Sequence, residues 1–234
     1  FEWKGRERII MDIKAVLTAL AAIALFLLIR IRDRKKYGSQ EGHIAIETNR
    51  SGIDAALSLL NETFHCPFPH YQIPDEIHMI LRREPRSEYG LQLFLQSIAQ
   101  HCDYHRHQLE LHIYNQEEGA APGRISYRGG NRYVIELHMA ADCRRETIMA
   151  VLIHEFCHFY LDQHGIGYEV TRENEILTDV SSVYFGFGNF MRAGYRPSVE
   201  TGSGNNHLYW VGYICVSEID YAEAVCEKMA EDNL

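Results

Sequence analysis

Residues 148–158 read Ile-Met-Ala-Val-Leu-Ile-His-Glu-Phe-Cys-His, and they say most about how this chain folds and what it binds. The apolar run predicts a buried helix. On a helix, residues four apart are offset by about 40° around the axis, so His154 and His158 project from one face a turn apart. That spacing allows two imidazoles to bind one zinc ion and leaves Glu155 beside the metal to handle a water proton. Cys157 occupies a variable position of this H-E-x-x-H motif, and we expect it to pack rather than to bind metal.

A second helix follows, and it offers the further ligand that a catalytic zinc site needs. Such a site has three protein ligands and one position open to water. Gly165 and Gly167 end the first helix, and residues 173–185 then carry apolar residues at helical spacing. Glu175 and Asp179 are four apart on one face of this second helix. The spacing alone leaves two questions open: whether this face is a solvated acidic surface, and which carboxylate is the ligand.

The two helices together resemble those of the gluzincin metallopeptidases, the thermolysin-like superfamily. The pattern of that family is H-E-x-x-H, a short connection, and N-E-x-x-x-D on the next helix. This chain has Asn174, Glu175 and Asp179 in that arrangement. The resemblance implies that Glu175 is the third zinc ligand and that Asp179 accepts a hydrogen bond from the non-ligating nitrogen of a zinc histidine. A bond of that kind fixes the tautomer and the orientation of a ligating imidazole.

A further resemblance, over about residues 130 to 230, is to a group of uncharacterised bacterial HExxH peptidases. It rests on four short segments, namely Leu177-Thr178-Asp179, Phe185-Gly186-Phe187-Gly188-Asn189-Phe190, Gly212-Tyr213 and Tyr221-Ala222-Glu223-Ala224. This resemblance implies no substrate. We expect Gly186 and Gly188 to end the second helix or to let it pack closely on another backbone.

The segments before the metal motif predict a mixture of helices and strands. Helical spacing predicts helices over residues 53–64 and 89–102, whereas alternation predicts strands over residues 76–81 and 109–114. The turn Arg128-Gly129-Gly130-Asn131 predicts a hairpin between strands 124–127 and 132–138.

The predicted architecture is an α+β fold, with a zincin-like catalytic domain over residues 37–234. In this architecture a small sheet packs on the H-E-x-x-H helix and the second ligand helix. An edge strand above the cleft of such folds holds an extended peptide, and we assign that position to residues 133–138. Residues 37–47 are predicted to be a polar linker.

Residues 1–36 are predicted to be an N-terminal membrane anchor with a basic flank. Residues 15–29 contain no charge, and adding Ile13 and Ile31 brings the segment near the roughly 20 residues that a bilayer core requires. A buried core helix and a cleaved signal peptide are the alternatives. The segment is apolar all round and no small-residue cleavage site follows it, so we expect a single-pass transmembrane helix.

The charges around this segment predict its orientation. Five basic residues lie within residues 30–36, and only Lys14 precedes the segment if Met11 is the natural start. The positive-inside rule then places the catalytic domain in the cytoplasm. If residues 1–10 are native, their basic residues nearly cancel this bias.

Composition excludes some partners. A formal net charge of −9 without a basic stripe in the body of the chain argues against nucleic-acid binding. The six cysteines form no C-x-x-C pair, so we expect scattered thiols rather than a disulfide or zinc-knuckle framework.

The sequence therefore predicts a membrane-anchored zinc metallopeptidase that acts on a peptide or protein substrate. Zn²⁺ would be bound by His154, His158 and Glu175, and Glu155 would be the general base. Candidates for the donor that stabilises the transition state are His207, Tyr209 and Tyr213. The alternative is a zinc-containing sensor or scaffold without turnover, in which Glu155 would be dispensable.

A second metal site is a further alternative. His101 and His105 are four apart in the sequence His-Cys-Asp-Tyr-His-Arg-His, residues 101–107. The arginine and the strand predicted to begin nearby favour an exposed turn instead.

Overall fold

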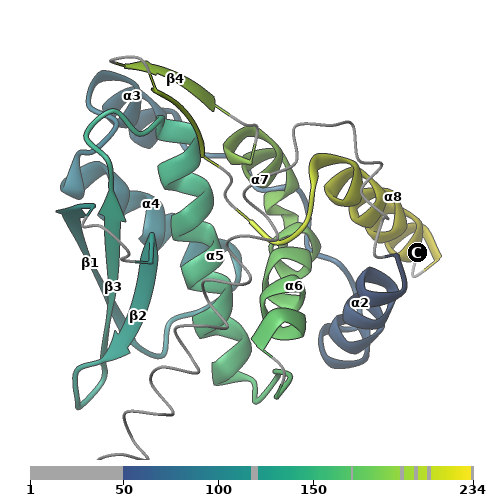
Figure 1. Ribbon diagram of the computed structural model, residues 1–234. Coiled ribbons are helices and arrows are strands. Elements are labelled where there is room, and N and C mark those ends of the chain that lie inside the picture. Colours follow the sequence, from purple (N-terminus) through teal and green to yellow (C-terminus); the bar gives the residue numbers. More distant parts are fainter. Residues whose placement is uncertain are drawn as a thin grey trace, which may run out of the picture. The chain divides into compact units, whose positions relative to one another are not determined.

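The computed structural model describes residues 50–116, 121–169, 171–195, 198–202, 205–209 and 212–232. Helices pack on one face of a three-stranded sheet, so the α+β class predicted from the sequence is confirmed (Figure 1). In chain order the elements are α2 Arg50–Phe64, α3 Asp75–Arg83, α4 Glu88–His101, β1 Gln108–Asn115, β2 Gly123–Tyr127, β3 Arg132–Met139, α5 Arg145–Gln163, α6 Thr171–Ser182, the π-helical turn η1 Val183–Phe187, α7 Gly188–Gly194, β4 Ser198–Gly202, β5 Asn205–Tyr209 and α8 Val216–Asp232.

The sheet has the strand order β1-β3-β2, with β1 parallel and β2 antiparallel to β3. The predicted hairpin is confirmed, and its turn uses Gly129 and Gly130 at φ 88° and 63°, where glycine carries no steric penalty. The prediction that residues 133–138 form an edge strand is wrong, because β1 pairs with β3 on the side away from β2. A continuous buried run over residues 134–137 suits a central strand, and the edge strands are β1 and β2 instead.

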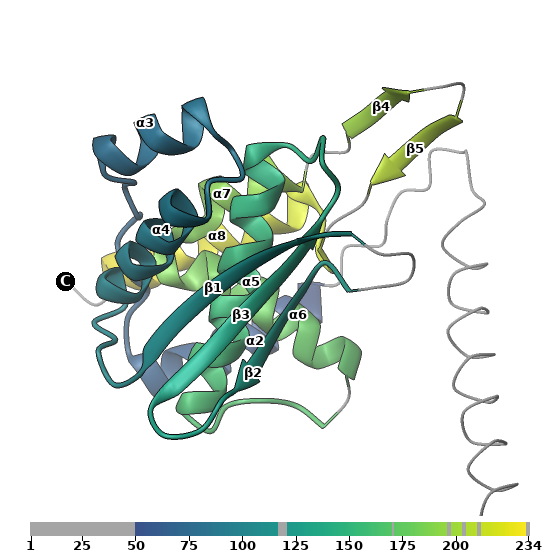
Figure 2. The ribbon, with the colours of Figure 1, turned by 90° about the vertical axis from the view of Figure 1, so that its left-hand side faces the viewer.

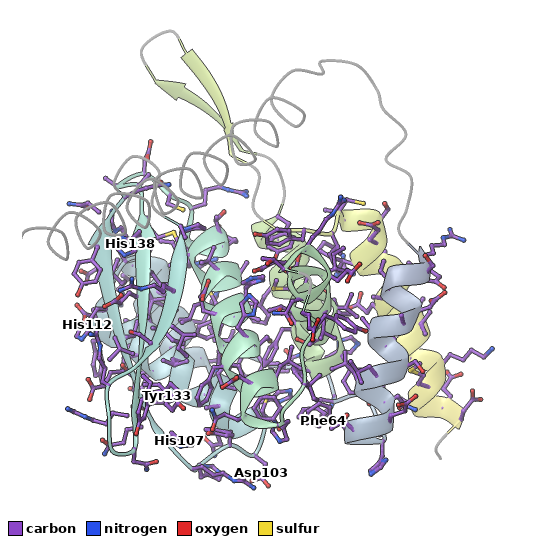
Figure 3. All side chains as sticks on the ribbon, turned by 60° about the horizontal axis from the view of Figure 1, so that its bottom comes forward. Phe64, Asp103, His107, His112, Tyr133 and His138 are labelled. Atoms are coloured by element: carbon purple, nitrogen blue, oxygen red, sulfur yellow. The ribbon has the colours of Figure 1, made fainter. Side chains whose placement is uncertain are left out.

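The two faces of the sheet differ in character. The register places Leu111 of β1 and Ile125 of β2 beside Ile135, on the face that α4 and α5 cover. His112, Arg124 and Glu136 lie on the opposite face, which no described helix covers (Figure 2). His138 of β3 pairs with Tyr114, two residues after His112 in β1, so its side chain lies on the same face as His112, and Figure 3 labels both histidines.

Helix α5 runs through the middle of the domain, between the sheet and the pair α6 and α7 (Figure 1). Residues on every side of it are buried, which explains an apolar run without an amphipathic stripe. It approaches α7 closely at Gly194, where a β-carbon would overlap Ala150. Thr147 reinforces this contact by donating a hydrogen bond to the Gly194 carbonyl at 3.2 Å. Gly165 follows α5 at φ 68° and ends it, as predicted.

The prediction of a strand over residues 76–81 is wrong, because these residues belong to α3. Buried Ile77 and Leu81 are four apart on one side of this helix, whereas Met79 is 47% exposed. Asp75 and Glu76 lie in the first turn and arginines in the last, which complements the helix dipole. The pattern that suggested alternation in residues 76–81 is therefore part of the helical spacing of α3. The predicted helices over residues 53–64 and 89–102 and the strand over residues 109–114 are confirmed.

Helix α6, which carries Glu175 and Asp179, ends near Gly186 and Gly188, as we expected from these glycines. Helix α6 passes into η1, where Gly186 has φ 86° and its carbonyl accepts a hydrogen bond from the Tyr71 N–H at 3.0 Å. Gly188 then lies so close to Glu223 of α8 that a β-carbon would crowd its carboxylate. These contacts lock the bend between α6 and α7.

The predicted anchor and the linker at residues 37–47 lie outside the residues that the structure describes. Among the helices of the described ranges, none has the length and apolarity needed to cross a membrane.

Candidate metal centre

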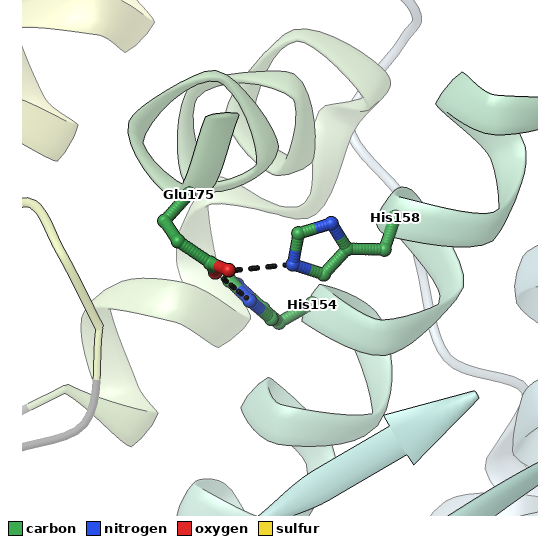
Figure 4. A group of neighbouring side chains, drawn as sticks. All are labelled: His154, His158 and Glu175. Carbon is green, nitrogen blue, oxygen red and sulfur yellow. Dashed lines mark hydrogen bonds and ion pairs between the residues drawn. The ribbon is translucent and has the colours of Figure 1, made fainter. Parts of the chain in front are cut away.

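The H-E-x-x-H helix and the second ligand helix bring three donor atoms to one point (Figure 4). The Nε2 atoms of His154 and His158 each lie 3.1 Å from Oε2 of Glu175. These ligand atoms all lie within 4.8 Å of one another, so the three residues could hold a metal ion. Two imidazoles and one carboxylate are a donor set that zinc accepts at a site with one open position. The group therefore fits the metal that the sequence implies.

The other ring nitrogen of each histidine is occupied, and this selects the tautomer that metal binding needs. Nδ1 of His158 lies 3.0 Å from the hydroxyl of Thr178, which donates its own proton to the Asn174 carbonyl at 2.9 Å. The hydroxyl oxygen therefore accepts the Nδ1–H of His158. Nδ1 of His154 donates to Oδ1 of Asp179 at 2.8 Å. In a neutral ring, both Nε2 atoms are then free to bind a metal.

Asp179 is fully buried and is held by groups from several elements. Its Oδ1 accepts hydrogen bonds from His154 and from the hydroxyl of Tyr195. Its Oδ2 accepts from the backbone N–H groups of Tyr213 at 2.6 Å and Ile214 at 3.2 Å. Four donors around one buried carboxylate satisfy its two oxygen atoms and hold it in position.

The charges at the site shift its protonation equilibria when no metal is present. Burial lowers the pKa of His154, but hydrogen bonds to Asp179 and Glu175 outweigh burial and raise this pKa to about 10. Burial raises the pKa of Glu175, but hydrogen bonds from His154 and His158 lower it to about 2. The metal-free site is thus prepared to exchange a proton for a cation.

Glu155 lies beside the ligands in a constrained position. Burial raises the pKa of its carboxyl group above the ordinary value, and the two histidines oppose that shift. Gly123, at the start of β2, lies directly against this side chain, because a β-carbon there would overlap its Cγ, Cδ and Oε1 atoms. A buried carboxylate with a raised pKa beside a metal site suits a group that takes and returns a proton.

A cavity of about 630 Å³ opens over the three ligands and Glu155. Its walls come from α5, α6, the edge strand β2, and the side chains of Tyr195 and Tyr213. The Tyr213 side chain is 54% exposed, and its ring lies nearly parallel to that of His154 with 6.2 Å between centroids.

The open edge of β2 lines this cavity with backbone groups. The Pro122 carbonyl accepts from the His138 N–H, and the Arg128 N–H donates to the Arg132 carbonyl. In an antiparallel ladder, residues that pair in this way alternate with residues whose backbone groups point to the other side. The N–H and C=O groups of Gly123, Ile125 and Tyr127 therefore point away from β3.

Other residues considered from the sequence are not part of this group. His101 Nε2 bonds the Phe185 carbonyl at 3.0 Å, and His105 lies 3.3 Å from Asp103. In the part of the chain that the structure describes, the three-ligand group is the only cluster suited to a metal, so the second metal site finds no support. His207 and Tyr209 lie on β5, whose side chains are outside the description. None of the six cysteines forms a disulfide in the described residues, as expected, and Cys157 is buried and accepts a hydrogen bond from Ser182.

Several residues of the site had no predicted role. Thr178 appeared only in a resemblance, although its position, three residues after Glu175, faces the same histidine pair. Tyr195 and Gly123 carried no signal, because each reaches the site through tertiary packing from a distant segment.

The chain matches no protein-family model, and it has no match among the curated proteins or the solved structures.

Proposed function

We propose that this chain is a zinc-dependent metallopeptidase, and the observation that carries the proposal is the position of Glu155. Its carboxylate lies beside a three-ligand metal group, at the floor of a cavity that reaches the ligands. A site that served only to order the fold would use four protein ligands and would need no buried carboxylate next to them. This favours hydrolysis over a zinc-containing sensor or scaffold.

His154, His158 and Glu175 would hold the zinc ion. When bound, that ion supplies Lewis acidity, which polarises a carbonyl group and acidifies water. Glu155 accepts the proton of the attacking water and returns it to the leaving amine. Thr178 and Asp179 keep the two imidazoles in the ligating tautomer.

A peptide is the substrate that the cavity wall favours. An extended chain laid along β2 would pair with the outward N–H and C=O groups of Gly123, Ile125 and Tyr127. Such pairing would recognise the substrate through main-chain hydrogen bonds rather than through its side chains. It would also place a scissile bond beside Glu155, which contacts Gly123. Of the donor candidates, Tyr213 has a described side chain, and it is exposed at the cavity wall, where it could contact such a substrate.

The substitution Glu155→Gln tests the proposal. It keeps the size of the side chain but removes the base, so peptide termini produced by the native protein should disappear from the proteome of cells that carry the variant. Glu173→Gln on the exposed side of α6 is a matched control and should preserve those termini. Identical peptide termini for Glu155→Gln and the native protein would favour the sensor or scaffold.

We further propose that residues 13–31 anchor the protein in a membrane as a single pass, with the catalytic domain in the cytoplasm. The full chain should then pellet with membranes and resist carbonate extraction, whereas a chain starting at Tyr37 should stay in the supernatant. Protease added to intact cells should leave the catalytic domain uncut. Release of the full chain by carbonate would contradict the anchor.

A further inference from the structure

Asp179 is the point at which two distant positions of the chain meet at the metal centre. Tyr195, at the end of α7, and the Gly212–Ile214 segment, just before α8, flank residues 196–211. The hydroxyl of Tyr195 donates to Oδ1 of Asp179, and the N–H groups of Tyr213 and Ile214 donate to Oδ2. The residues on both sides of this segment are therefore hydrogen-bonded to the carboxylate that orients His154.

Gly212 makes this junction possible. Its φ of +99° is a conformation that other residues rarely adopt, and a β-carbon there would overlap the ring of Tyr195. The ring is buried, so it has little room to move away. The glycine thus allows the backbone to pass against the ring and to deliver the next two N–H groups to Asp179.

We infer that Tyr195 and Gly212 are positioning residues that set the metal affinity of the site by fixing Asp179 against His154. The buried carboxylate has no contact with solvent, so its position depends on its four donors. A displaced carboxylate would leave the His154 ring less well oriented, and loss of an outer partner of a metal-ligating histidine typically weakens metal binding 10- to 100-fold.

The same geometry couples metal binding to the positions of Tyr195 and residues 212–214. If the hydrogen bonds from Tyr195 and residues 213–214 to Asp179 strengthen metal binding, then metal binding must stabilise those hydrogen bonds by the same factor. The inference rests on the metal site of the proposed function and does not require peptide hydrolysis.

The substitution Tyr195→Phe tests it, because the ring remains against Gly212 and only the hydroxyl is lost. Zn²⁺ affinity, measured by chelator competition on the full chain, should fall about tenfold. With Co²⁺ as a probe, the visible absorption spectrum should shift as His154 reorients. The matched control is Tyr184→Phe, which removes a buried hydroxyl bonded to Asn61 at 3.2 Å, away from the site. It should leave the affinity and the spectrum unchanged.

Hydrogen exchange gives a second measurement on the native protein. Zn²⁺ should slow exchange of the Tyr213 and Ile214 amides, and the protection should be smaller in Tyr195→Phe. Gly212→Ala should weaken Zn²⁺ binding at least as strongly as Tyr195→Phe. The strained-glycine control Gly186→Ala, at φ 86° against the Pro69 carbonyl, should affect thermal stability rather than affinity.

Equal Zn²⁺ affinities and Co²⁺ spectra for the native protein and Tyr195→Phe would overturn the inference while leaving the metal site in place. A native protein that binds no Zn²⁺ would overturn the proposed metal centre, and the inference with it.

Discussion

Gly123 leaves the space that the Glu155 side chain occupies, although the two residues lie on different elements and are far apart in sequence. A β-carbon at Gly123 would overlap three atoms of Glu155. The φ of Gly123 is outside the left-handed region, so the glycine is needed for room and not for backbone conformation.

If Glu155 is the general base, as we propose, Gly123→Ala should lower kcat by about 100-fold, since a displaced base loses most of a contribution that is typically 10²- to 10⁴-fold. Metal content should stay the same, because none of the three ligands moves. Steady-state kinetics and elemental analysis measure both. Ser126→Ala, on the other face of the same strand, is the control and should keep kcat. An unchanged kcat in Gly123→Ala would show that Glu155 tolerates displacement or is not the base.

Thr178 should contribute to Zn²⁺ affinity by orienting His158, as Asp179 does by orienting His154. Thr178→Val removes the acceptor of the His158 Nδ1–H at similar side-chain size, so Zn²⁺ affinity should fall 10- to 100-fold in a chelator titration. Thr178→Ser keeps a hydroxyl and should restore most of the affinity. If the serine and valine variants bind Zn²⁺ equally, the hydroxyl has no role in the site.

Glu175 and Asp179 should differ in what their loss does to the metal. Glu175→Ala removes a ligand and should empty the site at ordinary Zn²⁺ concentrations, as should His154→Ala or His158→Ala. Asp179→Asn should retain Zn²⁺ with weaker affinity, because it loses an outer partner only. His112→Ala, on the far face of the sheet, is the control and should keep full metal content. The reverse ranking of Glu175→Ala and Asp179→Asn by elemental analysis would exchange the two roles.

Zn²⁺ binding should release protons and weaken in acid. With the pKa of His154 raised to about 10, this ring is protonated at pH 7 in the metal-free protein and must lose its proton to bind Zn²⁺. Each proton displaced makes affinity fall about tenfold per pH unit as pH decreases below that pKa. Calorimetry in buffers of different ionisation enthalpy should count at least about one proton released at pH 7. Zero protons would contradict the charged state of His154.

The same shifts set the stability of the metal-free protein. The pKa of His154 is raised on folding, so its contribution is complete below its unfolded value of 6.5 and is lost as pH rises toward 10. The pKa of Glu175 is lowered, so its contribution is present above its unfolded value of 4.5 and is lost as pH falls toward 2. Both contributions should be complete between about pH 4.5 and 6.5. Thermal unfolding with a chelator present should show a decline on both sides of that range, and His154→Asn should remove the alkaline decline.

Local spacing determined the helical part of the site. His154 and His158 are one turn apart, as are Glu175 and Asp179, and a helix of 3.6 residues per turn places each pair on one face whatever else the chain does. The helices α5 and α6, the hairpin of β2 and β3, and the end of α5 near Gly165 followed from such short-range rules. The failure at α3 has the same origin, because six residues of apolar and polar alternation fit either period.

The tertiary structure decided the strand order and the contacts between separate segments, which residue spacing does not specify. Insertion of β3 between β1 and β2 left β2 at one edge of the sheet, because β1 pairs in parallel with the other side of β3. Packing alone placed Gly123 against Glu155 and brought Tyr195 and the 213–214 amides to Asp179. These contacts join separate segments of the chain, so no short-range spacing rule relates their residues. Their energy comes from burial and from satisfying the hydrogen bonds of a buried carboxylate.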